Sequence, residues 1–134
     1  MSRTLALALF ALVSCSAPQR AHLRAENALG PYSGSVEAQG LVFVSGKGGA
    51  KGSSFAEEAE GAIRAVEKEL ARSGLGLADV VSCTVFLTDM GQYPEFNQVY
   101  ARLFPEPWPA RACVAVAALP ANLRVELQAV AARR

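Results

Sequence analysis

Histidine is almost absent from this sequence. Among its 134 residues only His22 is a histidine, and it lies in the N-terminal leader region. A Ser-His-Asp triad, a Cys-His dyad and a metal site with several histidines are therefore excluded from the body of the chain. The three cysteines, Cys15, Cys83 and Cys113, include no Cys-x-x-Cys pair. The sequence thus predicts neither a disulfide framework nor a zinc knuckle.

An excess of either charge is also missing. The 13 basic and 12 acidic side chains leave a formal net charge of +1, which argues against a general nucleic-acid binder. The length is that of one domain, and 51% of the residues are hydrophobic. A chain of this size can bury a single core without a metal or a disulfide to stabilise it.

No apolar run near the N-terminus is long enough to span a bilayer. The run from Leu5 to Val13 falls short of the roughly 20 residues that a mature transmembrane helix needs. It follows Arg3 and has the length of a signal-peptide core. The overlapping segment Leu12-Val13-Ser14-Cys15 resembles the bacterial lipobox, whose cysteine is lipidated and becomes the new N-terminus. We therefore expect residues 1–20 to be a leader and tether, and residues 21–134 to form the single domain.

This leader decides where the protein is expected to reside. With a lipid on Cys15, the domain is a lipoprotein of the cell envelope that faces the periplasm. The lipid is then its only expected contact with a membrane. The alternative is a wrongly assigned start codon, or an apolar tail on a cytosolic protein, and the domain is then cytoplasmic.

Hydrophobic periodicity predicts alternating strands and helices in the rest of the chain. Short β-branched and aromatic runs indicate strands, and a capping box at Ser54-Phe-Ala-Glu57 indicates the start of a helix. The predicted order is β-β-α-β-α-β-β, an α+β class with one mixed sheet and both helices on one face. The predicted strands cover residues 35–39, 41–45, 80–88, 112–118 and 124–131, and the helices run from Ser54 to Ser73 and from about Pro94 to Phe104.

Several local predictions accompany these elements. Glu58 and the other charged residues that we place on the polar side of the first helix are expected to be solvated. The glycine-rich stretch Lys47–Ser53 lacks the spacing of a P-loop and is expected to be a flexible connector. In the strand at 80–88, one face is expected to carry Val81, Cys83, Val85 and Leu87, with Cys83 in the core.

Two charged side chains lie where a strand would hold them. Arg111 opens a strand, and its guanidinium can bind a carboxylate or phosphate through two parallel hydrogen bonds. Glu126 lies in the last strand on the face opposite the apolar residues, where a carboxylate can orient or deprotonate water. The alternative is that both are ordinary solvated residues.

Three further residues allow two interpretations each. Cys113 shares a strand face with Arg111, and is either a small buried hydrophobe or a thiol whose pKa the arginine lowers. Tyr32 lies in a turn-prone segment, and is either an apolar plug or a hydroxyl that lines a pocket. Asn97 lies on the polar side of the second helix, and is solvated unless a pocket lies against that helix.

Ordered strings of residues together resemble the RidA/YjgF family of imine deaminases over residues 27–132. Their number and their order make this resemblance specific, whereas any one string would be weak. The strings are Leu29-Gly-Pro-Tyr-Ser33, Leu41-Val-Phe-Val-Ser-Gly46, Asp79-Val-Val, Thr84-Val-Phe-Leu-Thr-Asp-Met90, Phe96-Asn-Gln-Val-Tyr100, Pro107-Trp-Pro-Ala-Arg-Ala-Cys-Val114, Leu119-Pro and Val125-Glu-Leu-Gln-Ala129.

The resemblance implies a chorismate-mutase-like fold and a homotrimer with three sites in clefts between subunits. It implies hydrolysis of reactive 2-imino acids and their enamine tautomers, such as 2-aminoacrylate, to 2-keto acids and ammonia, with no metal or other cofactor. Arg111 matches the arginine that binds the substrate carboxylate, and Glu126 matches the glutamate that positions and activates water. Matches to pocket-lining positions are Tyr32, Ser45, Gly46, Asn97 and Cys113.

The sequence departs from the family pattern after Ser45-Gly46, where the family commonly has Gln, an aliphatic residue and Pro. Here Lys47-Gly-Gly-Ala follows, and the connection to the first helix is shorter. Because this segment shapes the pocket, the alternative to a deaminase is a non-catalytic module that binds a small carboxylate or a protein. Endoribonuclease activity, which is attached to some relatives, is disfavoured by the near-neutral charge and the scarcity of histidine.

Overall fold

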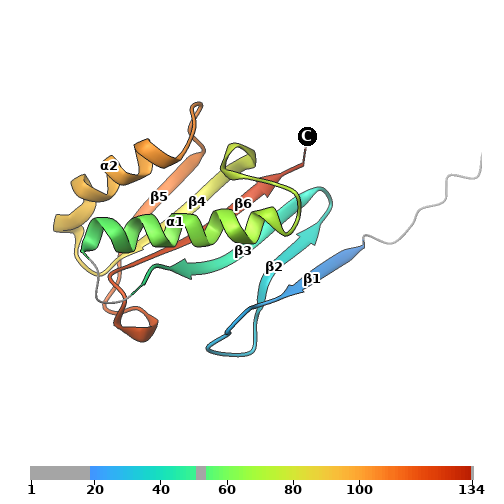
Figure 1. The fold of residues 1–134 in the computed structure, drawn as a ribbon, viewed down its shortest axis with the longest axis horizontal. Helices are drawn as coiled ribbons and strands as arrows, with labels where there is room; N and C mark the ends of the chain where they lie inside the picture. The colour runs from blue at the N-terminus through green and yellow to red at the C-terminus, as the bar shows by residue number, and fades with distance from the viewer. Residues whose placement is uncertain (1–18, 51–53, 134) are drawn as a thin grey trace, which may run out of the picture.

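A computed structural model of the chain describes residues 19–50 and 54–133, which form one six-stranded sheet and two α-helices (Figure 1). Cys15 and the rest of the predicted leader up to residue 18 lie outside the described residues. The elements are β1 (Arg20–Arg24), β2 (Ser33–Ala38), β3 (Leu41–Gly48), α1 (Phe55–Ala71), β4 (Val80–Leu87), α2 (Tyr93–Leu103), β5 (Ala110–Ala115) and β6 (Val125–Ala132), with short 3-10 turns at 77–79, 90–92 and 120–122.

The sheet is mixed, as the sequence predicts, and its strands lie in the order β1-β2-β3-β6-β4-β5. All neighbouring strands are antiparallel except β4 and β5, which are parallel. Figure 1 shows α1 and α2 beside each other over the same face of the sheet. The α+β class and the placement of both helices are therefore confirmed. The last strand, β6, lies between β3 and β4, so it is flanked by strands that come much earlier in the sequence.

Strand β1 was not predicted from the sequence. It pairs antiparallel with β2 at the edge of the sheet, where its segment Arg-Ala-His-Leu-Arg shows little hydrophobic alternation. His22 therefore belongs to the folded sheet, and its placement in the leader region was wrong. Its Nδ1 atom lies 3.3 Å from Ser33 Oγ on the exposed surface. Within residues 19–50 and 54–133 no carboxylate is bonded to this histidine, so the contact does not form a triad.

The hydrophobic core lies between the helices and one face of the sheet. On α1, Ala59, Ile63, Val66 and Leu70 are completely buried at helical spacing, so this stripe faces the strands. The strands contribute alternate residues, and Cys83 lies in the core as predicted. Val81 does not, because a register shift between Val80 and Ser82 turns Val80 inward and leaves Val81 47% exposed.

Two local predictions about the start of α1 were wrong. Glu58 is buried rather than solvated, because its carboxylate has a partner in the core-facing layer. Lys47 and Gly48 are part of β3, and Gly49 packs so closely on the backbone of Glu58 that a Cβ atom would not fit there. The described part of the glycine-rich stretch is therefore a strand end and a packed turn.

No helix within the described residues is long and apolar enough to cross a membrane.

Candidate active site

The guanidinium of Arg111 is held by one face of helix α2. Strand β5 places Arg111 next to Cys83 of β4, directly beneath the helix. Nη2 of Arg111 donates hydrogen bonds to Asn97 Oδ1 at 2.7 Å and to Tyr93 Oη at 3.2 Å. The guanidinium carbon also lies 4.5 Å from the ring centre of Tyr100, within the range of cation–π attraction. The arginine is therefore oriented before any ligand arrives.

The aromatic rings under Arg111 are themselves fixed in place. Tyr100 stacks on Phe104 with ring centres 4.2 Å apart, and its hydroxyl lies 3.1 Å from the buried Cys83 Sγ. The ring centres of Phe96 and Tyr93 lie 5.6 and 5.7 Å from the guanidinium carbon of Arg111. Tyr93, Phe96 and Tyr100 were not selected as site residues from the sequence. The helical spacing of Tyr93, Asn97 and Tyr100 was the signal that could have identified this arrangement, because it places all three on one face.

A hollow of about 410 Å³ opens beside this arginine. It is lined by Asn97, Tyr100, Ala101, Trp108, Pro109 and Arg111. Nη1 and Nε of Arg111 make no hydrogen bond to any described residue. Their N–H groups are thus available to an anionic ligand, for which a guanidinium provides a planar set of donors.

Glu126 lies in a second hollow, of about 520 Å³, together with Tyr32, Ser45 and Gly46. Its carboxylate packs directly on Gly46, where a Cβ atom would collide with Oε1. Burial raises the pKa of Glu126, and no hydrogen bond or ion pair from the described residues opposes this effect. A carboxyl group whose pKa is raised accepts a proton more readily than an exposed glutamate and can return it.

The predicted site residues, apart from Cys113, are therefore divided between two hollows on opposite faces of the sheet, and Cys113 lines neither of them. Arg111 and Cys113 are paired with the core residues Cys83 and Val85, so their side chains lie on the helix face. Glu126 alternates with the buried residues Val125 and Leu127, so it points to the open face. Within one protomer, Arg111 and Glu126 cannot contact the same small molecule.

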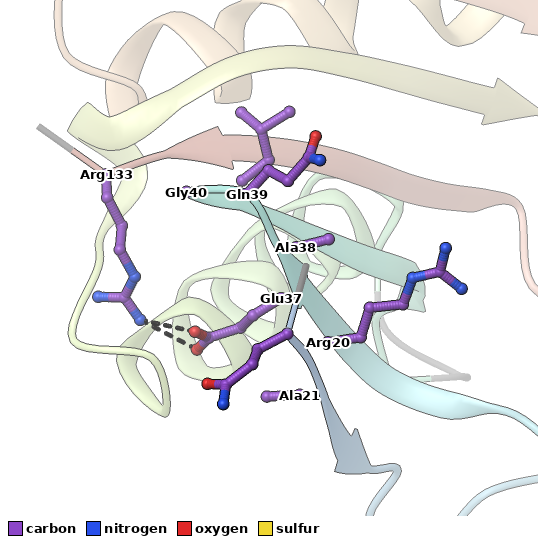
Figure 2. A pocket seen from close by; sticks show the side chains of 9 residues that line it. Arg20, Ala21, Glu37, Ala38, Gln39, Gly40 and Arg133 are labelled. Atoms are coloured by element: carbon purple, nitrogen blue, oxygen red, sulfur yellow. Dashed lines mark hydrogen bonds and ion pairs between the residues drawn. The ribbon is translucent and has the colours of Figure 1, made fainter. Parts of the chain in front are cut away.

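A third hollow lies at the far end of the sheet, near the C-terminus (Figure 2). It is lined by the turn from β2 to β3 and by residues of β1, and Figure 2 shows Arg133 bonded there to the carboxylate of Glu37. None of the predicted site residues lines it. The described residues also contain no group of three or more side chains that could hold a metal ion.

Comparison with known proteins identifies the chain's relatives. A family model described as endoribonuclease L-PSP matches residues 23–133. The chain belongs to the RidA/YjgF family. A human 2-iminobutanoate/2-iminopropanoate deaminase is 36% identical over 115 residues, which cover 81% of this chain and 84% of the human protein.

Solved structures of RidA-family proteins share the fold. Yeast Mmf1 is 34% identical with a TM-score of 0.81, and the match covers 87% of this chain and all of the yeast chain. TdcF from Escherichia coli, crystallised with bound serine, is 32% identical with a TM-score of 0.77, over 83% of this chain and 94% of that one. Several RidA relatives are named reactive intermediate deaminases, so the chain is a member of a deaminase family.

The cysteine thiols of this RidA-family protein should react slowly at neutral pH. Burial raises the pKa of Cys113 above its ordinary value of 9.0 more strongly than the charge of Arg111 lowers it. In a Cys15→Ser protein, reaction of Cys113 with Ellman's reagent should therefore be slower than that of free cysteine at pH 7, and should accelerate above pH 9. Arg111→Ala should slow it further. Cys113→Ala identifies the signal, and rapid reaction at pH 7 would contradict the prediction.

Proposed function

We propose that this chain hydrolyses reactive 2-imino acids and their enamine tautomers, of the 2-aminoacrylate type, to 2-keto acids and ammonia. The observation that carries the proposal is Arg111, whose guanidinium is pre-oriented by Asn97 and an aromatic face while Nη1 and Nε remain available. A substrate carboxylate is a suitable ligand for these donors. The name of the human relative, 2-iminobutanoate/2-iminopropanoate deaminase, supports the same substrate class.

The reaction requires only positioning and proton transfer. The imine carbon of a protonated 2-imino acid is electrophilic, so water can add to it without a metal or a covalent nucleophile. Glu126 accepts a proton from the attacking water as the C–O bond forms, and the product is a tetrahedral carbinolamine. Transfer of that proton to the nitrogen makes ammonia a leaving group, and as the C–N bond breaks Glu126 takes the proton of the carbinolamine hydroxyl, so that ammonia and the 2-keto acid are released. Arg111 holds the carboxylate so that the carbon faces this water.

A complete site for this mechanism needs two copies of the chain, because Arg111 and Glu126 lie on opposite faces of the sheet. The open face is also apolar where a partner would cover it. Phe43 pairs with Val130 and Phe86 pairs with Val114 across neighbouring strands, and Phe43 and Val114 are 44% and 41% exposed. Exposed apolar side chains gathered on one face are typical of an interface. We propose a homotrimer in which the Glu126 hollow of one copy meets the Arg111 hollow of the next.

Loss of either proposed catalytic group should remove the activity. With 2-iminopropanoate generated by an amino-acid oxidase and the remaining imine trapped by semicarbazide, Arg111→Ala should lower kcat/KM at least about 100-fold, because the substrate carboxylate loses its partner. Glu126→Gln keeps the shape of the side chain but cannot accept the proton, so kcat should fall similarly. Arg102→Ala, which removes an exposed arginine of α2, serves as the control and should retain activity.

Unchanged hydrolysis by Arg111→Ala would overturn this mechanism. No acceleration by the wild-type protein with several imino acids, combined with measurable binding of 2-keto acids, would instead favour a non-catalytic carboxylate-binding module. The departure at Lys47 is the feature that would then explain the missing activity.

Light scattering should find a trimer. Substitution of Phe43 by Glu places a charge on the apolar open face, away from both Arg111 and the core. We expect it to yield monomers and to abolish imine hydrolysis together with trimer formation, because each site then lacks half of its residues. Met90→Glu, at a residue that is 41% exposed and outside the sheet, is the matched control. A wild-type protein that is monomeric and fully active would contradict the shared site.

We also propose, from the sequence alone, that residues 1–20 deliver the domain to the cell envelope. The family match begins at residue 23 and does not include them. When the full chain is expressed in a bacterium, mass spectrometry of the membrane fraction should find Cys15 as a lipidated N-terminus. Cys15→Ser should remain unprocessed. An intact, unlipidated Met1 on the wild-type protein would refute the proposal and support a cytoplasmic location.

A further inference from the structure

Helix α1 carries two glutamates on the face that it presses against the sheet. Glu58 and Glu69 are 2% and 5% exposed, whereas Glu60 on the same helix is 40% exposed at its side chain. The two buried residues are 11 positions apart, which is close to three helical turns, so they lie along one stripe. Burial of a carboxylate is costly unless the charge is paired, and each of these residues has a specific cationic partner.

Glu69 is bonded to β3 through Lys47. The carboxylate accepts hydrogen bonds from Lys47 Nζ at 3.0 Å, Ser35 Oγ at 2.8 Å and Arg72 Nη1 at 2.8 Å. Burial acts to raise the pKa of Glu69, but the bonds from Lys47 and Ser35 and the charge of Arg72 together hold it below its usual value. The Lys47 side chain is itself only 17% exposed. Lys47 is the residue at which this sequence departs from the family pattern.

Glu58 is bonded to the segment that precedes β6. Its Oε1 atom accepts a hydrogen bond from the backbone N–H of Arg124 at 2.6 Å, and its Oε2 atom accepts one from Arg124 Nε at 2.7 Å. One carboxylate thus holds both the main chain and the side chain of a single residue. Arg124 lies two positions before Glu126 in the sequence.

One partner, Lys47, lines the Glu126 hollow, and the other, Arg124, directly follows Leu123, which also lines it. Lys47 and Gly48 are paired with Leu127 and Glu126 in the ladder between β3 and β6, just after the register shift in β3. Gly46, one position before Lys47, is the residue on which the Glu126 carboxylate packs. The Lys47–Glu69 bond therefore holds the β3 wall of the hollow, and the Arg124–Glu58 bond holds the chain that enters β6.

We propose that Glu58 and Glu69 are positioning residues, which hold the two walls around Glu126 and thereby keep its carboxylate aligned for water activation. The inference rests on the proposed function only for the part that concerns catalysis. The bonds are suited to this role because each joins a buried carboxylate to a backbone segment of the hollow, and a buried charge that loses its partner is strongly unfavourable. The exposed pair between Glu60 and Arg102 has no such consequence.

The test compares Glu58→Gln and Glu69→Gln with Glu60→Gln as the matched control. Each change keeps the shape of the side chain and removes its charge. We expect kcat for imine hydrolysis to fall about tenfold or more in the first two variants, since a small displacement of a catalytic group has large kinetic effects. KM should stay within about twofold, because the substrate carboxylate is bound by Arg111, to which neither glutamate is bonded. Glu60→Gln should retain the wild-type kcat and KM. Lys47→Arg keeps the positive charge that pairs with Glu69, so it should retain far more activity than Lys47→Met.

A second measurement separates positioning from mere stabilisation and does not require activity. The charged and titratable groups near Glu126 are Tyr32, Glu26 and Lys47, which line the same hollow, and Arg124. The ¹³C signal of the Glu126 carboxyl should titrate above the ordinary glutamate pKa of 4.5 in the wild-type protein, because the carboxyl is buried. In Glu58→Gln and Glu69→Gln, the walls of the hollow are held less firmly and admit water, so the titration midpoint of Glu126 should move toward 4.5. The measurement is made at a temperature where circular dichroism shows that both variants are folded.

The outcomes distinguish the two proposals. A wild-type protein without hydrolytic activity, whose Glu126 midpoint still shifts in both variants, would overturn the proposed function and leave the positioning of Glu126 supported. An active wild-type protein whose kcat and Glu126 midpoint are unchanged in both variants would overturn the positioning role and leave the deaminase standing. Equal loss of kcat in Glu60→Gln would also overturn it.

Discussion

The packing of α1 across β3 and β6 is the contact on which the rest of this structure depends. The apolar stripe of the helix covers the strands that carry Ser45, Gly46 and Glu126, and the same stripe contains the buried carboxylates of Glu58 and Glu69. Apolar burial supplies the general attraction between helix and sheet. The two carboxylates add direction, because Glu58 accepts bonds from Arg124 and Glu69 accepts one from Lys47 at the end of β3. A purely apolar interface would leave the ends of β3 and β6 less precisely placed.

The structure assigns different physical environments to its two candidate catalytic groups. Arg111 lies among aromatic rings and an amide oxygen, which orient a permanent positive charge without neutralising it. Glu126 lies in a hollow where burial alone perturbs it, so the pKa of its carboxyl is raised. A fixed cation for a substrate carboxylate and a proton-accepting carboxyl for water are complementary parts of one hydrolytic site. They lie on opposite faces of one sheet, and assembly of several copies is the simplest way to bring them together.

The two ion pairs of α1 give the departure at Lys47 a structural meaning. The sequence alone shows a lysine and glycines in a short connection, which is typical of a mobile loop. In the structure Lys47 continues the strand and its ammonium is bound to Glu69, and Gly49 allows the chain to approach the backbone of Glu58. The lysine at this point is thus paired with an opposite charge on the facing helix. The altered segment is packed against the domain as far as it is described.

Much of the fold was predictable because it depends on local patterns. The capping box at Ser54 set the start of α1, alternation in 80–88 indicated β4, and the prolines after Phe104 ended α2 within a residue of the predicted position. The alternation of β6 was also sufficient to place Glu126 on the face opposite the core. The order of the strands was not available in this way, since the insertion of β6 between β3 and β4 depends on long-range pairing that no local spacing encodes. The weak edge strand β1 and the bulge that exposes Val81 depend on the same pairing.

The sequence by itself determined which residue types are available to the site: a strand arginine, a strand glutamate, and almost no histidine or net charge. Only the tertiary structure decided how these residues are grouped. It separated Arg111 from Glu126, surrounded the arginine with Tyr93, Phe96 and Tyr100, and buried Glu58, which the helical pattern had placed in solvent. The physical reason is that burial and pairing of a charged side chain are set by what lies opposite it. For Glu58 and Glu69 the partners are 66 and 22 residues away along the chain.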